Sequence, residues 1–392
     1  MSDRSLSRQT AIVGFGSTAY GEQFRNPRPD WGAIDFALEA SARAIADAGL
    51  KKRDIDGLIL SGVPEYESFM FRSGLTDVRF LGHYPMGGRL CPAALAHAAM
   101  AVHHDLADYV LLFNTVTFRS SGMRFGGGDE AIRNNRRPVA TMESSYSLAY
   151  GMSTPGALYA LAYSGYRHEF KVGEDELGHV SLSIRQWAAK NPDAIYRDPI
   201  TLEDYHSARY IAEPLRLFDY CTVNDGCAAY VVTTAERAND LPHVPVLIAS
   251  VAERANVREY YASEDRWSDA CHSLKYDLFD RVGMSIDEID SVQVYDNFSP
   301  AVLWVLEGFG FAEKGESLDR IAGGWIAPGG ELPVNTSGGM LSEAYLQGWN
   351  NHVEAVRQLR GDAGERQIPG CRAIMYAGLS AIPAGDVLVR GD

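Results

Sequence analysis

The chain has 392 residues, of which 46% are hydrophobic and 22% are charged, the composition of an ordinary soluble globular protein. The formal net charge of −15 argues against binding to nucleic acid or to an anionic membrane, because both would require a concentrated basic face. No window approaches the roughly 18 apolar residues of a membrane-spanning helix, and residues 1–10 lack an apolar signal region. We therefore expect a cytoplasmic protein of two or three domain-sized units.

The cysteines fit a reducing compartment. They are odd in number, and none is paired with a histidine at metal-binding spacing. We expect reduced thiols, and no structural zinc, at Cys91, Cys221, Cys227, Cys271 and Cys371.

The first part of the chain alternates strands and helices. Residues 10–16 predict a buried strand that runs into a glycine turn, which lacks the third glycine of a dinucleotide-binding fingerprint. Apolar residues recur at helical spacing from Ile34 to Ala48, and Gly49 ends this helix. A charged link then leads to a strand over Ile55–Leu60.

The segment from Gly49 to Leu60 returns much later in the chain. Gly283–Val294 has the same order of glycine, acidic link and apolar strand at a constant shift of 234 positions (283 − 49). This order also arises by chance in α/β proteins, so coincidence stays open as an alternative. A true repeat predicts two duplicated α/β halves.

Both halves continue with a glycine turn and a helix. In the first half, residues 86–88 precede an alanine-rich helix over Pro92–Val102, whose small residues predict burial on every side. In the second half, the turn Ser337-Gly338-Gly339 follows a strand end and leads into a helix that carries Tyr345.

The middle of the chain is less regular. Residues 115–215 are rich in glycine, arginine and tyrosine and contain two predicted helices, which indicates an inserted cap over a site. We expect an α/β fold in which residues 1–114 and 216–240 form the first half and residues 241–392 the second. Asp225-Gly226 is typical of a tight turn before a return strand.

Two tyrosines stand where proton transfer could occur. Tyr295 follows the predicted strand of the second half, and Tyr345 follows the Ser-Gly-Gly turn. Strand ends are common places for sites in α/β sheets, and a phenol can donate or accept a proton. Taken singly, each is more often a packing residue in a chain with 20 tyrosines, and the neighbouring Asp296 is more often a cap.

Cys91 and the Ser-Gly-Gly turn are the other candidates. A thiol just ahead of a helix N-terminus can become a nucleophile, although a buried hydrophobic role is more frequent. Backbone N–H groups of the turn could face an acyl oxygen, although glycine in such turns usually serves packing.

Several ordered motifs resemble the sterol-carrier-type thiolases over nearly the whole chain. Tyr295-Asp296-Asn297-Phe298 is similar to their His-Asp-x-Phe motif, and Asn335-Thr336-Ser337-Gly338-Gly339 with Tyr345 is similar to their Asn-x-Ser-Gly-Gly motif with its following His. The middle of the chain matches at three further segments: Asn191–Thr201, Ile211–Leu215 and Asn224–Ala229.

The departures from thiolases decide the implied chemistry. The position of the nucleophilic cysteine falls at Gly88, the second cysteine falls near Gly378, and tyrosines replace both histidines. Acyl-enzyme chemistry thereby loses its nucleophile and its base. The pattern resembles instead the thiolase-like, lipid-transfer-protein-type aldolases of steroid side-chain degradation.

This resemblance implies retro-aldol cleavage of a β-hydroxyacyl-CoA into a ring ketone and propanoyl-CoA. Tyr295 and Tyr345 would share the acid and base roles, and Asp296 would tune or orient Tyr295. The backbone at Ser337, Gly338 and Gly339, with Gly378, would bind the thioester oxygen. No cofactor is implied beyond the CoA of the substrate, and no metal site. A homodimer and a small OB-fold and zinc-ribbon partner protein are implied as well.

Two other functions stay open from the sequence. One is an acyl-CoA acyltransferase in which Cys91 is a displaced nucleophile, although no active-site histidine is evident for it. The other is a non-catalytic thiolase-like binding or scaffold subunit.

Overall fold

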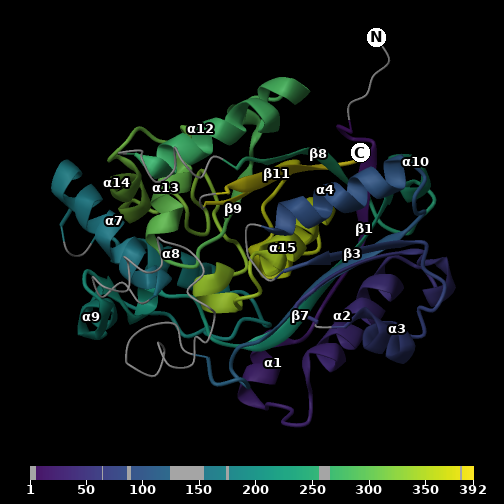
Figure 1. Ribbon diagram of the computed structural model, residues 1–392. Helices are drawn as coiled ribbons and strands as arrows, with labels where there is room; N and C mark the ends of the chain where they lie inside the picture. Colours follow the sequence, from purple (N-terminus) through teal and green to yellow (C-terminus); the bar gives the residue numbers. More distant parts are fainter. Residues whose placement is uncertain are drawn as a thin grey trace.

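The computed structural model (Figure 1) describes residues 6–63, 65–85, 90–123, 154–173, 176–255, 265–379 and 382–392. Within these residues the chain forms a nine-stranded mixed sheet in the order β3-β2-β4-β7-β1-β8-β11-β10-β9. The strands are β1 (Thr10–Ser17), β2 (Gly57–Ser61), β3 (Phe80–Tyr84), β4 (Val110–Thr117), β7 (Asp225–Thr234), β8 (Val246–Glu253), β9 (Ser291–Val294), β10 (Ala373–Gly378) and β11 (Ala384–Arg390).

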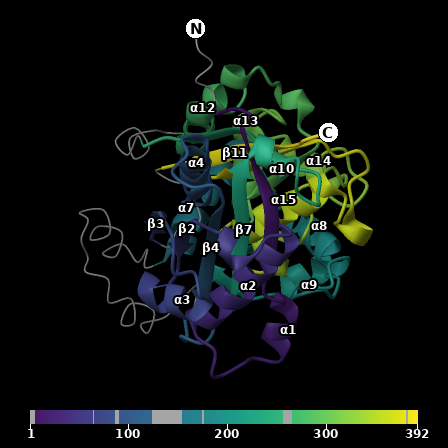
Figure 2. The same ribbon diagram turned by 90° about the vertical axis from the view of Figure 1, so that its right-hand side faces the viewer.

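Helices cover both faces of this sheet (Figures 1 and 2). α4 (Leu90–His103) and α15 (Trp349–Arg360) pack on one face, in a core cluster that spans both halves. The opposite face is covered by α2 (Ala33–Asp47) and α3 (Tyr66–Ser73) in the first half and by α12 (Arg266–Leu278) and α13 (Pro300–Phe309) in the second. Side chains alternate between the two faces, as the two-residue period of strands requires.

The two halves share one strand order, β1-β7-β4-β2 in the first and β8-β11-β10-β9 in the second, which confirms the predicted duplication. The 3₁₀ turns at Lys52–Asp54 and Ile286–Glu288 precede β2 and β9, and these positions differ by the same shift as the sequence segments. Asp56 accepts hydrogen bonds from the N–H groups of Asp108 (2.8 Å) and Tyr109 (2.9 Å), just before β4. Asp290 accepts them from Arg372 (2.7 Å) and Ala373 (2.9 Å), where β10 begins. The halves meet where β1 pairs with β8 in antiparallel register.

The two long described helices of the inserted region pack on the second half. α7 (Pro155–Phe170) and α8 (Gly178–Ala189) bury apolar side chains in the same cluster as α12 and α13. The remaining described elements of this region are α9 (Leu202–Ser207), the hairpin β5 (Tyr210–Ala212) and β6 (Leu215–Arg216), and the 3₁₀ turn Leu217–Asp219. The predicted domain boundaries remain a prediction.

The structure corrects two expectations from the sequence, and a third lies outside the described residues. Asp225 and Gly226 do not form a tight turn but begin β7, because the Asp225 carboxylate holds the N–H groups of Arg119 (2.9 Å) and Ser120 (3.1 Å) beyond β4. The alanine-rich helix begins at Leu90, two residues before Pro92, and its Met100 is 42% exposed. The expected turn at residues 86–88 lies outside the described residues.

The remaining described elements are short: α1 (Tyr20–Arg25), α10 (Ala235–Ala238), α14 (Ser317–Ala322), the π-helix Gly339–Glu343 and the 3₁₀ turns Asp280–Val282 and Gly364–Arg366. In the described part of the chain, we find no helix with the length and apolar character needed to cross a membrane.

Candidate active site

The structure brings the two predicted tyrosines into direct contact. Their hydroxyl oxygens lie 2.7 Å apart, although the residues are separated by 50 positions in the chain. Tyr295 directly follows β9, where its N–H donates to the Ala377 carbonyl (2.9 Å) at the end of the neighbouring β10. Tyr345 is 8% exposed and comes from the segment between the π-helix and α15. This hydrogen-bonded phenol pair is the centre of the candidate site.

Tyr345 does not lie on a helix as the sequence predicted. The helical stretch after the Ser-Gly-Gly turn is a π-helix that ends at Glu343, and Ala344 is fully extended. Gln347 (φ 57°) and Gly348 (φ 89°) are then left-handed before α15 begins. Gly348 lies so close to the Tyr376 hydroxyl that a Cβ there would be 2.0 Å from its oxygen. Close packing against Tyr376 thus requires glycine at the start of α15.

Residues of the first half fix the backbone on both sides of Tyr345. The Tyr345 N–H donates to Asn224 Oδ1 (2.7 Å), and the Leu346 carbonyl accepts from Asn114 Nδ2 (3.1 Å). The ring of Phe118 stacks on the ring of Tyr345, with 5.5 Å between centroids and 24° between planes. Asn114 and Phe118 carry no sequence signal of this role, whereas Asn224 belongs to a segment that resembles the thiolase pattern.

Asp296 faces the glycine turn. Its Oδ1 accepts the Met340 N–H (2.8 Å), and a Cβ on Gly339 would lie 2.3 Å from its Oδ2. Burial raises the pKa of Asp296 to about 7, against the opposing effect of the Met340 N–H. Among the described contacts, no hydrogen bond joins its carboxyl group to the Tyr295 hydroxyl. Its predicted role in orienting Tyr295 remains a prediction.

The other predicted oxyanion residues pack closely against the protein. The Ser337 hydroxyl donates to Glu343 (2.6 Å), and a Cβ on Gly338 would lie 2.5 Å from Ala188 Cβ. Gly378 is the last residue of β10 and pairs with Ala384. The role of these residues in binding the thioester oxygen is untested by these contacts.

Burial governs the protonation of the tyrosine pair. It raises the pKa of both Tyr295 and Tyr345 above the ordinary value for a phenol. Hydrogen bonds from Tyr295 and Gln347 act in the opposite direction on Tyr345. Both phenols are therefore protonated in the free protein at neutral pH.

A second polar cluster, which the sequence did not reveal, lies between α4 and α15. Cys91 Sγ lies 3.2 Å from His352 Nδ1 and 3.1 Å from the Tyr230 hydroxyl. His352 Nε2 lies 2.8 Å from Asp386 Oδ2, and both side chains are fully buried. Sequence reasoning therefore missed a histidine that lies beside the candidate nucleophile Cys91.

The chemistry of this cluster does not favour an acyltransferase. Burial raises the pKa of the Cys91 thiol, against the effect of His352, and its side chain is fully shielded from solvent. Burial alone would lower the pKa of His352, but Asp386 and Cys91 raise it to about 10. A cationic imidazole cannot act as the base for the thiol.

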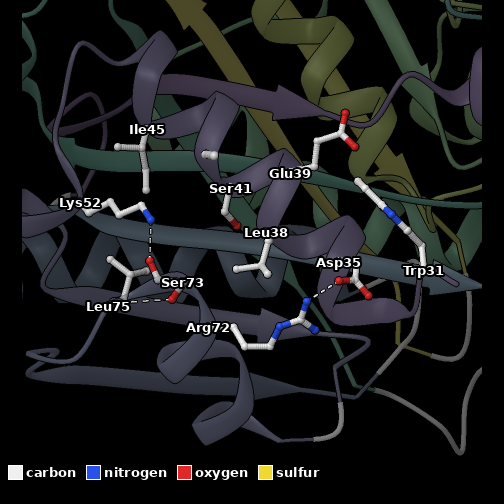
Figure 3. A pocket seen from close by; sticks show the side chains of 11 residues that line it. Trp31, Asp35, Leu38, Glu39, Ser41, Ile45, Lys52, Arg72, Ser73 and Leu75 are labelled. Atoms are coloured by element: carbon white, nitrogen blue, oxygen red, sulfur yellow. Dashed lines mark hydrogen bonds and ion pairs between the residues drawn. The ribbon is translucent and has the colours of Figure 1, made fainter. Parts of the chain in front are cut away.

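One described cavity lies far from this chemistry. It has a volume of about 420 Å³ and opens between α2 and α3, with Trp31, Leu38, Lys52 and Arg72 among its lining residues (Figure 3). None of the predicted site residues lines this cavity.

Comparisons with known proteins identify the fold and the family. Residues 256–385 match the model of the family described as "Thiolase C-terminal domain-like". A 17-hydroxy-3-oxo-4-pregnene-20-carboxyl-CoA lyase from Mycobacterium tuberculosis is 36% identical, with 98% of this chain and 100% of the relative covered. A steroid side-chain-cleaving aldolase from Thermomonospora curvata is 34% identical, with 99% of each chain covered. The solved "Ltp2-ChsH2(DUF35) aldolase" is 33% identical, covers 99% of each chain and superposes with a TM-score of 0.88.

The fold and the hydrogen-bonded phenol pair define a thiolase-like protein whose candidate site is built on two tyrosines. The identities over nearly the full length then settle the family: the chain belongs to the steroid side-chain-cleaving aldolases with a thiolase-like fold. The predicted family resemblance and the predicted fold class are confirmed.

Proposed function

We propose that this protein is a carbon–carbon lyase that cleaves a steroid side-chain β-hydroxyacyl-CoA by a retro-aldol reaction. The observation that carries the proposal is the 2.7 Å contact between the Tyr295 and Tyr345 hydroxyls, in a chain whose relatives are named as lyase and aldolase. A pair of phenols supplies the proton acceptor and the proton donor that this reaction needs. The products are a ring ketone and propanoyl-CoA.

The reaction balances without a covalent intermediate. One phenol first gives up its own proton to water, and its phenolate oxygen takes the proton of the tertiary hydroxyl. The bond between the ring carbon and the α-carbon breaks, and its electron pair moves into the thioester as an enolate. A proton passed through the phenol pair to the α-carbon then gives propanoyl-CoA and restores the phenolate. Because no electron leaves the substrate and no group is transferred to the protein, we propose that no cofactor is needed beyond the CoA of the substrate.

Gln347 distinguishes the two phenols. Burial raises the pKa of Tyr345, and the hydrogen bonds from Tyr295 and from the Gln347 side chain oppose this rise. A phenol oxygen that already accepts such hydrogen bonds holds a negative charge better than its partner. Tyr345 is therefore the phenol that gives up its own proton first and then takes the substrate proton, and Tyr295 is the proton donor in this scheme.

The assembly of the protein is part of the proposal. The solved aldolase carries two component names, Ltp2 and ChsH2(DUF35), which supports a partner protein for this chain. We propose that the partner is a small protein with an OB-fold and a zinc ribbon. We also propose a homodimer, which is supported by the edge position of β3, paired on one side with β2, and by Leu81 on that strand, which is 46% exposed.

The test is cleavage of 17-hydroxy-3-oxo-4-pregnene-20-carboxyl-CoA by the protein coexpressed with its partner, followed by mass spectrometry. We expect a ring ketone and propanoyl-CoA with the wild type, and losses of about 10²- to 10⁴-fold in Tyr295→Phe and Tyr345→Phe. Tyr276→Phe is the matched control, since this tyrosine is 60% exposed on α12. Full activity in either site variant would contradict the assigned roles.

A further inference from the structure

The proposed reaction needs a hydrogen-bond donor for the thioester oxygen. As the carbon–carbon bond breaks, negative charge collects on this oxygen, and a fixed donor in a buried site stabilises it. One N–H of the glycine turn predicted for this task is already in use, since that of Gly338 donates to the Asn335 carbonyl (2.8 Å). A side-chain donor near the phenol pair can act with this turn or in its place.

We infer that the side-chain amide of Asn224 is this donor, an inference that rests on the proposed function. Asn224 is 1% exposed and immediately precedes β7. Its Oδ1 accepts the Tyr345 N–H (2.7 Å) and the Thr222 hydroxyl (2.8 Å). Because a backbone N–H only donates, the contact with Tyr345 fixes which end of the amide is oxygen.

The other end of the Asn224 amide is left without a partner. Its Nδ2 is buried and makes no hydrogen bond with any residue that the structure describes. Buried side-chain donors in native proteins usually have an acceptor, and an unpaired one calls for an explanation. A substrate oxygen that enters the site would supply the missing acceptor.

The backbone of the loop that carries Asn224 is hydrogen-bonded to the segments that contain the two site tyrosines or pack against them. The Asn224 carbonyl accepts the N–H of Phe118 (3.3 Å), whose ring stacks on Tyr345. Two residues of the same loop make the remaining contacts, the Cys221 N–H with the Asn297 carbonyl (3.1 Å) and the Thr222 N–H with the Met340 carbonyl (2.9 Å). The loop thus runs between the segment after Tyr295 and the segment before Tyr345.

The role assigned to Asn224 is electrostatic. Its N–H donates to the thioester oxygen while the electron pair of the broken bond moves onto that oxygen, and the amide neither gains nor loses a proton. A neutral amide suits this task, because it stabilises the enolate without drawing a proton from the phenol pair.

Proton exchange on propanoyl-CoA tests this role apart from bond cleavage. In D₂O, an enzyme that forms the enolate of propanoyl-CoA exchanges its α-protons for deuterium, which mass spectrometry detects. Asn224→Asp keeps an acceptor for the Tyr345 N–H and removes the donor, whereas Asn224→Ala removes both. Asn114→Ala is the matched control, because it removes the other side-chain contact with this backbone and leaves Asn224 in place.

We expect both Asn224 variants to lose about 10²- to 10³-fold in cleavage kcat and in exchange rate, as when an oxyanion donor is removed. Asn114→Ala should stay within about tenfold of the wild type, because it loses one neutral hydrogen bond. Thermal unfolding identifies any variant that fails to fold. Exchange at the wild-type rate in folded Asn224→Asp would overturn the inference, as would an equal loss in folded Asn114→Ala. A wild type that neither cleaves nor exchanges would overturn the proposed function itself.

Discussion

His352 Nε2 on α15 lies 2.8 Å from Asp386 Oδ2 on β11, and neither side chain is exposed. Asp386 and Cys91 raise the pKa of His352 to about 10 in spite of burial, so the imidazole is cationic at neutral pH. Loss of one member of such a buried pair strongly destabilises a protein, whereas the intact pair adds little stability, because both groups have lost their hydration. It anchors the helix that begins four residues after Tyr345.

Removing one member of this pair should destabilise the protein far more than removing both. We expect His352→Leu to lower the free energy of unfolding by about 3–5 kcal/mol, because the Asp386 carboxylate stays buried without a counter-ion. The double variant His352→Leu/Asp386→Val removes both charges and should recover much of this loss. Urea unfolding of the single and double variants measures the coupling. Additive effects would show that the two side chains do not act as a pair.

Cys91 should be dispensable for bond cleavage. Cys91→Ala is expected to cleave the steroid thioester at the wild-type rate and to lose only about 1 kcal/mol of stability from a smaller buried side chain. Mass spectrometry of the wild type after brief exposure to substrate should detect no acyl group on the thiol. An acyl adduct on Cys91, together with an inactive Cys91→Ala variant, would instead establish the acyltransferase.

Two glycines at the ends of α15 have nearly the same backbone conformation, but the space around them differs. Gly348 (φ 89°) and Gly361 (φ 88°) are both left-handed, so alanine at either position costs about 1–2 kcal/mol of backbone strain. A Cβ on Gly361 meets nothing within 4 Å, whereas one on Gly348 would overlap the Tyr376 hydroxyl. We expect Gly361→Ala to lose only the strain energy and Gly348→Ala to lose more stability and most activity, because it displaces the segment that holds Tyr345.

A variant without the Tyr376 hydroxyl tests the cause of that loss. Tyr376→Phe removes the oxygen that a Cβ on Gly348 would meet first. Gly348→Ala/Tyr376→Phe should therefore regain part of the stability and activity lost in Gly348→Ala, measured by thermal unfolding and by propanoyl-CoA release. If Tyr376→Phe gives no rescue, close packing is not the reason for the glycine.

Asp296 should make stability depend on pH. Burial raises its pKa from 3.8 to about 7, so between these values the folded protein holds a proton that the unfolded chain has lost. The contribution of Asp296 to the free energy of unfolding therefore falls as pH rises through this range, by about 1.4 kcal/mol per pH unit. Glu343 acts in the same direction, since burial raises its pKa to about 7.

Asp296→Asn removes this dependence while its amide oxygen can still accept the Met340 N–H. The unfolding free energy of the wild type minus that of Asp296→Asn should decrease between pH 4 and pH 7, as measured by urea unfolding. Asp280→Asn, at an exposed position, is the control. Parallel pH profiles for the wild type and Asp296→Asn would show that Asp296 is ionised throughout this range.

Local sequence patterns were enough to predict much of the fold. Hydrophobic periodicity identified α2 and the strand near Ile55, and the shift between Gly49 and Gly283 correctly indicated duplicated halves. Both glycines end a helical segment in the left-handed conformation, which is a local requirement that sequence records. The helix expected at Tyr345 was wrong, because contacts from Asn224 and Asn114 and the packing of Gly348 on Tyr376 fix that segment from outside.

The sequence by itself determined the candidates for the chemistry: two tyrosines in motifs that resemble those in which thiolases have histidines, in an α/β chain built from two related halves. Only the tertiary structure decided that their hydroxyls meet, because β9 and the segment before α15 are brought together by sheet pairing and core packing. It also decided that His352 pairs with Asp386 and that the Asn224 amide is left with an unpaired donor. Contacts between residues distant in the chain depend on how whole layers pack, and no local pattern encodes them.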